Sequence, residues 1–206
     1  MTNLKCCCSL LPLLTATVFL LGISLPVQAA IIPFVADPMN SLNEVPCNST
    51  DMAGTGTAVF NLDTVTLRVV GKLVYSGFSA GTVETGAHVH GNAGPCVGAN
   101  VLFPLPAGTP KNFAYTVTPQ QNLDMQSSLH YVNVHTNILP GGHLRAQIVP
   151  IPPTVATGAC CLKGGTECLI TDAQHCPAIG GSYQGDNTTC QGIQACCIPG
   201  QGCIMV

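Results

Sequence analysis

YVNVHTNILPGGHLRAQIV, residues 131–149, consists of two runs in which apolar and polar residues alternate, separated by a Pro-Gly-Gly turn. Side chains of a β-strand point alternately to the two faces of its sheet, and such runs around a Gly-containing turn are typical of an antiparallel hairpin. Val132 and Val134 form the apolar face of the first run, and that of the second is formed by Leu144, Ala146 and Ile148. The stretch therefore predicts a hairpin whose apolar face lies on a protein core.

The polar face of this hairpin carries candidate functional side chains. Directly opposed residues of an antiparallel pair lie on the same face of the sheet. If both apolar sets face the core, His135 of the first run lies on the outer face together with His143 and Arg145 of the second. Further residues of this face could fix the tautomers of histidine rings, and these are Tyr131, Asn133 and Gln147.

A His-Val-His step upstream adds two imidazoles to the same prediction. By strand alternation His88 and His90 project together, while Val89 points to the core. With His135 they place three imidazoles on one outer face. Neutral imidazoles are good ligands for copper or zinc, and three protein ligands leave one coordination position open. The sequence predicts a copper or zinc site, and the alternative is that these histidines only form hydrogen bonds to covering loops.

Residues 31–150 extend the β pattern over a whole domain. They are rich in Val, Thr, Leu and Phe with frequent Gly, Pro and Asn breaks, which is typical of an all-β antiparallel sandwich or barrel. Two further alternating runs supply apolar faces, Val65, Leu67, Val69, Leu73 and Tyr75 in one and Phe113, Tyr115 and Val117 in the other.

One short helix interrupts the strands. Thr118 and Pro119 are suited to the N-cap and the first helical position. The predicted helix ends near Ser128 and buries two apolar side chains, Leu123 and Met125.

The N-terminal segment, residues 1–30, predicts a signal peptide. Lys5 precedes an apolar run, and small residues before Ala29 and Ala30 suit cleavage after either one. A retained membrane anchor is the alternative, although no later segment has the roughly 20 apolar residues of a membrane span. We expect a secreted or periplasmic protein.

Cysteine and charge usage agree with export. Removal of the leader leaves ten of the thirteen cysteines, an even number that favours disulfides. Charged residues make up only 7% of the chain, and no basic stripe occurs. Nucleic acid and anionic membrane surfaces are therefore poor partners, and neither GxSxG nor HExxH points to a hydrolase.

The C-terminal part is predicted to be a separate disulfide module. A Pro-rich linker, residues 151–158, leads to residues 159–206, which repeat an Ala-Cys-Cys motif and carry Cys160, Cys161, Cys168, Cys176, Cys190, Cys196, Cys197 and Cys203. The segment resembles short Cys-rich repeats at the ends of bacterial secreted proteins. A zinc cluster is the alternative, but export favours disulfides, whose connectivity the sequence leaves open. A structural or adhesive role is expected.

Several motifs in order resemble the CHRD domain, a module of secreted proteins. They are LNEVP (42–46), GTGTA (54–58), AHVHG (87–91), YVNVHT (131–136) and PGGHLRAQ (140–147). The resemblance covers about residues 37–150 and implies a β-sandwich without an assigned activity. The family usually has an acidic residue at the position of His143, which makes this histidine a candidate fourth ligand.

A more distant likeness links the histidine strands to copper/zinc superoxide dismutases, which have a Greek-key barrel. GAHVH (86–90) looks like their copper-binding strand, and GGHLRA (141–146) looks like the strand with their anion-guiding arginine. The likeness implies copper as the ion, superoxide as a small anionic substrate, a guiding role for Arg145, and a disulfide between Cys96 and Cys47. Their zinc loop is missing, so the implied site is mononuclear and copper-only.

Three functions follow as hypotheses. The first is an exported protein that binds one copper ion and dismutates superoxide. The second is a non-catalytic extracellular module for adhesion or matrix attachment. The third is copper storage or delivery without turnover.

Overall fold

The computed structural model describes residues 30–47, 52–162 and 167–190. The predicted signal peptide, apart from Ala30, lies outside the described residues, as does the second Ala-Cys-Cys copy with Cys196, Cys197 and Cys203. Within the described ranges, no helix is long and apolar enough to cross a membrane.

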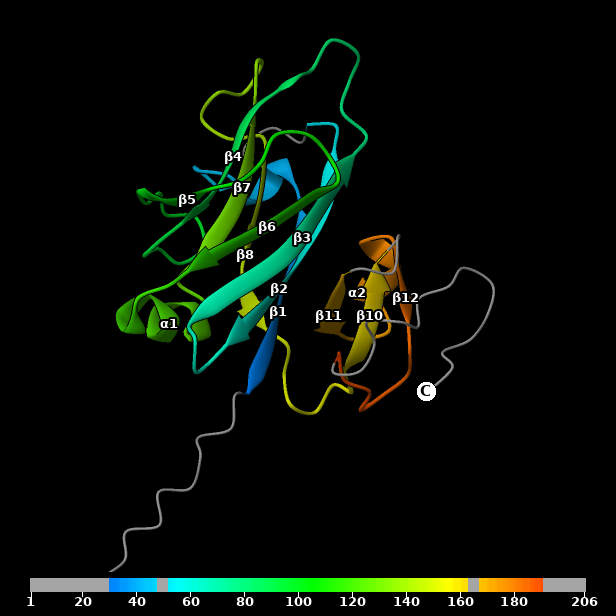
Figure 1. The fold of residues 1–206 in the computed structure, drawn as a ribbon. Helices are drawn as coiled ribbons and strands as arrows, with labels where there is room; N and C mark the ends of the chain where they lie inside the picture. The colour runs from blue at the N-terminus through cyan, green and yellow to red at the C-terminus, as the bar shows by residue number, and fades with distance from the viewer. Residues whose placement is uncertain (1–29, 48–51, 163–166, 191–206) are drawn as a thin grey trace, which may run out of the picture.

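Two antiparallel sheets form the larger part of the molecule (Figure 1). The first sheet has the order β6-β3-β2-β1-β9, with β1 at Ile31–Met39, β2 at Thr55–Asp63, β3 at Arg68–Ser76, β6 at Lys111–Thr116 and β9 at Val149–Pro150. The second has the order β5-β4-β7-β8, with β4 at Glu84–His90, β5 at Val101–Pro104, β7 at Tyr131–Thr136 and β8 at Leu144–Gln147. The chain passes between the sheets after β3, β5, β6 and β8, and this confirms the predicted sandwich.

The core lies between these sheets and is built by strand alternation. Phe34, Phe60 and Leu73 of the first sheet are fully buried against the second sheet. The predicted hairpin is confirmed, because Val132 pairs with Ala146 and Val134 with Leu144, and all four side chains are in the core. Burial of one such side chain stabilises the fold by about 1.5–3 kcal/mol. Each strand is therefore fixed with its apolar face toward the core.

The predicted apolar face near residue 65 is only partly right. Val69 and Leu73 are in the core, whereas Val65 is 49% exposed. Its backbone N–H donates to the Asp63 carboxylate in the turn before β3, so the strand begins only at Arg68 and the alternation does not reach Val65.

The predicted helix is α1, Pro119–Gln126. Thr118 caps it as expected, because its hydroxyl accepts from the Gln121 backbone N–H while the Gln121 side chain accepts from that of Thr118. Met125 is buried, but Leu123 is 57% exposed, so that part of the prediction is wrong. Residues two apart lie on nearly opposite sides of a helix, and only one of them can face the protein.

The C-terminal part forms a small module on the outer face of the five-stranded sheet (Figure 1). It contains a three-stranded sheet with β10 at Gly158–Leu162, β11 at Cys168–Thr171 and β12 at Gly181–Tyr183, a helix α2 at His175–Ala178, and disulfides Cys160–Cys176 and Cys168–Cys190. Cys161 is also disulfide-bonded. Leu162, Leu169 and Ile179 pack on Val59 of β2.

A side-chain amide fastens the module to the sandwich. Asn61 of β2 accepts from the Ile170 N–H at 2.6 Å and donates to the Ile170 carbonyl at 2.7 Å. Its amide thus pairs with β11 as a neighbouring strand would. The apolar contact and this pairing make the module part of the fold and not a freely tethered appendage.

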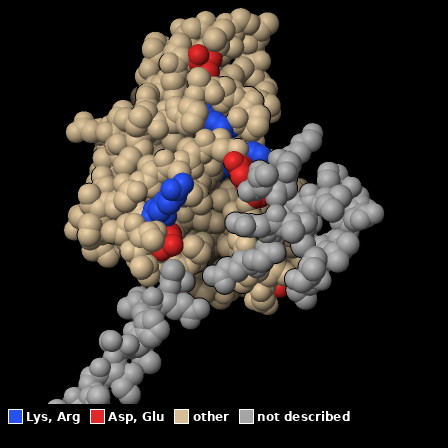
Figure 2. All heavy atoms as spheres, in the orientation of Figure 1, with Lys and Arg blue, Asp and Glu red and all other residues tan. Residues whose placement is uncertain are grey.

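A disulfide joins the segment that follows a short 3-10 helix to the loop that follows β4. The 3-10 helix η1, Ser41–Asn43, precedes Cys47, which forms a disulfide with Cys96. This confirms the pairing implied by the dismutase likeness. The face seen in Figure 2 is mostly uncharged, with a few basic side chains, some of them beside acidic ones, in keeping with the 7% charge of the chain.

Candidate metal centre

His88, His90 and His135 come together on the outer face of the four-stranded sheet. β4 and β7 are paired with His88 opposite Asn133 and His90 opposite Tyr131, so the three histidines share one face as predicted. One ring nitrogen from each lies within 4.8 Å of those of the other two. The opposite face at Val89, Val132 and Val134 is the core, and loops cover the histidine side.

Backbone carbonyls fix the proton positions of two of the rings. Nδ1 of His90 lies 2.9 Å from the Ala99 carbonyl oxygen, and Nδ1 of His135 lies 2.9 Å from that of Pro140. A carbonyl can only accept, so each Nδ1 carries the proton and each Nε2 offers a lone pair. Covering loops therefore orient the ligand atoms, a role that sequence analysis gave to side chains.

Each ring retains one buried nitrogen without a hydrogen-bond partner. These atoms are Nδ1 of His88, Nε2 of His90 and Nε2 of His135. Leaving a buried polar atom unpaired is unfavourable, and three of them in one cluster indicate a missing common partner. Nitrogens bound to one ion at 2.0–2.1 Å in a tetrahedral arrangement lie about 3.4 Å apart, so a pair at the 4.8 Å limit of this cluster has to close by more than an ångström to share an ion.

Burial favours the uncharged form of the histidine rings, which is the form that can bind a metal cation. The pKa values of His88 and His90 are lowered, mainly by burial and further by the neighbouring His135. A lowered pKa keeps an imidazole neutral at pH 7, which is the form that binds metals. Burial therefore keeps His88 and His90 in the neutral state in which they can bind a metal ion.

A stack of side chains supports His90. The Tyr131 ring is nearly parallel to the His90 ring, at 7° and with 4.7 Å between centroids. The Arg145 guanidinium carbon lies 3.5 Å from the Tyr131 ring centroid. Because β4 and β8 flank β7 on opposite sides, His90 and Arg145 occupy opposite faces of the tyrosine.

Arg145 lies on the predicted face but not at the surface. Its side chain is 1% exposed, and Nη2 donates to the carbonyl oxygens of Gly94 and Val97 at 3.1 and 2.9 Å. A residue that guides an anion from solvent has to face the solvent. Arg145 instead holds the loop that follows β4 against the sheet, and Gln147 binds the same loop through Ala93.

His143 is not part of the cluster, and its predicted place on the outer face is wrong. Its Nδ1 lies 2.9 Å from the Thr136 hydroxyl and its Nε2 lies 2.9 Å from the Ala53 carbonyl oxygen. The ring packs against Phe78 at the end of the core. β8 begins only at Leu144 and Gly142 has a positive φ of 142°, so strand alternation does not extend to His143.

Sequence analysis missed Glu44, which lies beside Arg145. This carboxyl is 8% exposed, and burial raises its pKa to about 7 against the lowering effects of Arg145 and the Asn133 amide. A Cβ at position 142 would overlap it, so the close approach requires Gly142. The only signal in the sequence was the position of Glu44 within the LNEVP motif.

His130 provides a test of how burial affects histidine in this fold. It is fully buried, both ring nitrogens lack partners, and burial lowers its pKa. Protonation below pH 6.5 then favours the unfolded chain, so stability present above that pH is lost as the pH falls toward the folded-state pKa.

In metal-free protein, His130→Leu is expected to reduce the dependence of the unfolding free energy on pH by up to about 1.4 kcal/mol per pH unit, measured by urea unfolding between pH 7 and 5. Equal slopes for both proteins would contradict the assignment.

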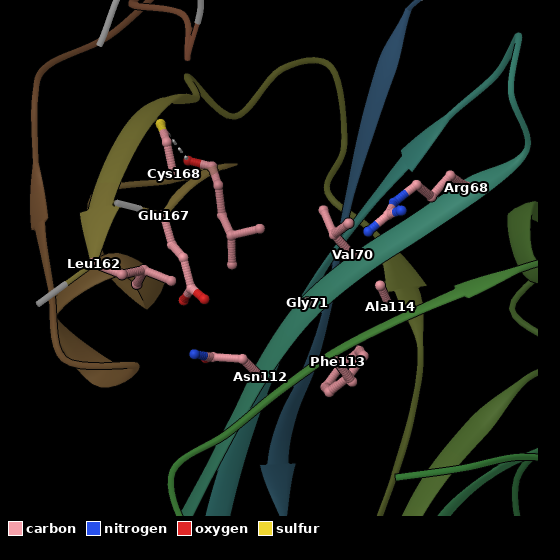
Figure 3. A pocket seen from close by; sticks show the side chains of 10 residues that line it. Arg68, Val70, Gly71, Asn112, Phe113, Ala114, Leu162, Glu167 and Cys168 are labelled. Carbon is pink, nitrogen blue, oxygen red and sulfur yellow. Dashed lines mark hydrogen bonds between the residues drawn. The ribbon is translucent and has the colours of Figure 1, made fainter. Parts of the chain in front are cut away.

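A separate crevice lies between the C-terminal module and the outer face of the five-stranded sheet. Figure 3 shows its two walls, with Arg68, Val70 and Asn112 on the sheet and Leu162 and Glu167 on the module. Across the described ranges, no salt bridge joins Arg68 to Glu167. No histidine lines this crevice, and the histidine cluster lies on the other sheet.

Comparison with known proteins identifies one family. The model of the CHRD domain matches residues 35–148, more than half of the chain, and the match includes all three histidines of the cluster. No curated protein and no solved structure matches the chain.

Proposed function

The chain belongs to the CHRD domain family, and on this premise we propose that it is an exported protein whose sandwich binds a single copper ion through His88, His90 and His135. The observation that carries the proposal is that one ring nitrogen from each of the three histidines lies within 4.8 Å of the other two, and that each ring also has a buried nitrogen without a hydrogen-bond partner. The disulfides favour an oxidising compartment outside the cytosol.

The donor set supports copper over other ions. Three neutral imidazoles suit copper or zinc, and Cu(II) binds nitrogen sites more tightly than the other divalent ions of its row. Neither a carboxylate nor a thiolate belongs to the cluster, and within the described residues it is the only group with metal-ligand spacing. A single ion with an open coordination position follows, and copper there would supply one-electron chemistry.

Superoxide dismutation is the second candidate, in which two superoxide ions and two protons give dioxygen and hydrogen peroxide. It is supported by the open position and by the place of the histidines on adjacent strands of a sandwich face. Because Arg145 is buried, we expect any such activity to depend less on ionic strength than that of a site with an exposed guiding cation.

Metal analysis tests the proposal. Purified protein loaded with Cu(II) and passed through a desalting column is expected to retain one equivalent, and an excess of Zn(II) should not displace it. Absence of stoichiometric copper would overturn the proposal.

Superoxide decay then separates the functions that involve copper. Loaded protein that accelerates decay, with the acceleration lost in His135→Ala, supports dismutation. Copper retention with decay no faster than in chelator-treated buffer selects storage or delivery. Attachment activity that survives replacement of all three histidines would instead favour an adhesion module.

A further inference from the structure

The stack of Arg145, Tyr131 and His90 places a positive charge behind the histidine cluster. A guanidinium is always protonated in proteins, and that of Arg145 is 1% exposed. Nη2 donates to neutral carbonyl and amide oxygens, while Nη1 has no partner. Among the described residues no salt bridge includes Arg145. The charge is therefore stabilised by dipoles and an aromatic face.

The nearest carboxyl compensates this charge only in part. Burial lowers the pKa of the Arg145 guanidinium, and Glu44 lies close enough to oppose that lowering. Burial raises the pKa of Glu44 itself to about 7. At neutral pH a substantial fraction of Glu44 is thus uncharged, and the cluster lies beside a net positive charge.

We propose that Arg145 is a positioning residue that acts through Tyr131 and His90 to favour Cu(I) over Cu(II) at this site. The inference rests on the proposed copper site. Loss of one electron raises the charge of the bound ion by one, so a fixed neighbouring cation disfavours Cu(II) more than Cu(I). The guanidinium carbon is no farther from the His90 ring centre than the 3.5 Å and 4.7 Å spacings of the stack together.

The expected effect is large enough to measure. At a separation of about 8–10 Å and an effective dielectric constant of about 20, one unit charge changes the ratio of the two affinities about twentyfold. The parallel stack also restrains the His90 ring, and Tyr131 accepts at its hydroxyl from the Ala99 N–H at 3.0 Å, beside the carbonyl that orients His90.

The test measures dissociation constants for Cu(I) and for Cu(II) separately, by competition with chelators on purified protein at pH 7. We expect Arg145→Gln to lower the ratio of Cu(I) to Cu(II) affinity about twentyfold, equivalent to about 77 mV for one electron. Arg145→Lys, which keeps the charge, should restore most of the ratio. Arg68→Gln, a change of the same type on the other sheet, should leave it unchanged.

Glu44→Gln gives an independent test in which Arg145 remains. It removes the partial counter-charge at nearly constant volume and is expected to raise the ratio, opposite to Arg145→Gln. An unchanged ratio in folded Arg145→Gln, an equal loss in Arg145→Lys, or a fall in Glu44→Gln overturns the inference while the copper site stands. Failure of the unsubstituted protein to bind copper overturns both.

Discussion

His90→Ala is expected to lower the affinity of the histidine cluster for Cu(II) by at least about a hundredfold. Loss of an outer group that only supports a ligand already costs 10–100-fold in metal affinity, and His90 is itself a proposed ligand. Its ring is held by the Ala99 carbonyl at Nδ1 and by Tyr131 on its face. Its removal takes away a preoriented nitrogen and leaves only two ligands.

The measurement is a Cu(II) competition titration, with far-UV and near-UV circular dichroism to verify folding. His130→Leu is the matched control, because it removes a buried histidine with unpartnered nitrogens that lies outside the cluster. His143→Gln should also retain copper, since both nitrogens of His143 are already engaged. Equal weakening in His90→Ala and His130→Leu would show that copper responds to general destabilisation.

Lys111→Met is expected to destabilise the fold by about 3–5 kcal/mol, the range for a buried charge that loses its partner. Lys111 Nζ lies 2.6 Å from Glu84 Oε1, and the two side chains are 0% and 8% exposed. The Tyr75 hydroxyl and the Gly108 N–H donate to Glu84 Oε2 at 2.5 and 2.9 Å. Because Glu84 is on β4 and Lys111 on β6, this network joins the two sheets at one end of the core.

Urea unfolding at pH 7 measures the loss. The double variant Glu84→Leu/Lys111→Met removes both charges and should recover most of it, because apolar replacement of a buried pair is often neutral. Arg68→Met, which changes a cation at the exposed start of β3, is the control for an unpaired site. A loss below about 1 kcal/mol in Lys111→Met would place the pair among ordinary surface ion pairs.

Sequence analysis worked best where alternation extends over a complete strand. Val132, Val134 and their partners on β8 are buried because a two-residue period leaves only one face for the core. The same parity placed His88, His90 and His135 together on the outer face, and the structure brings one nitrogen of each within 4.8 Å of the others.

The wrong predictions concern residues just outside a strand or on the solvent side of a helix. Val65 is in a turn before β3, and Leu123 is on the solvent side of α1. His143 precedes β8, and its ring turns toward Phe78. In each case the predicted pattern of buried and exposed side chains included a residue whose backbone conformation or position on the helix does not fit that pattern.

By itself the sequence determined the sandwich, the inner and outer faces of its hairpin, the three histidines and the disulfide-rich end, because side-chain periodicity and cysteine content are local properties. Only the tertiary structure decided the surroundings of those histidines. Carbonyls from separate loops select the nitrogens of His90 and His135, and Arg145 is buried beneath a loop beside Glu44. Such contacts depend on how loops far apart in the chain fold over one sheet, and no local repeat encodes that packing.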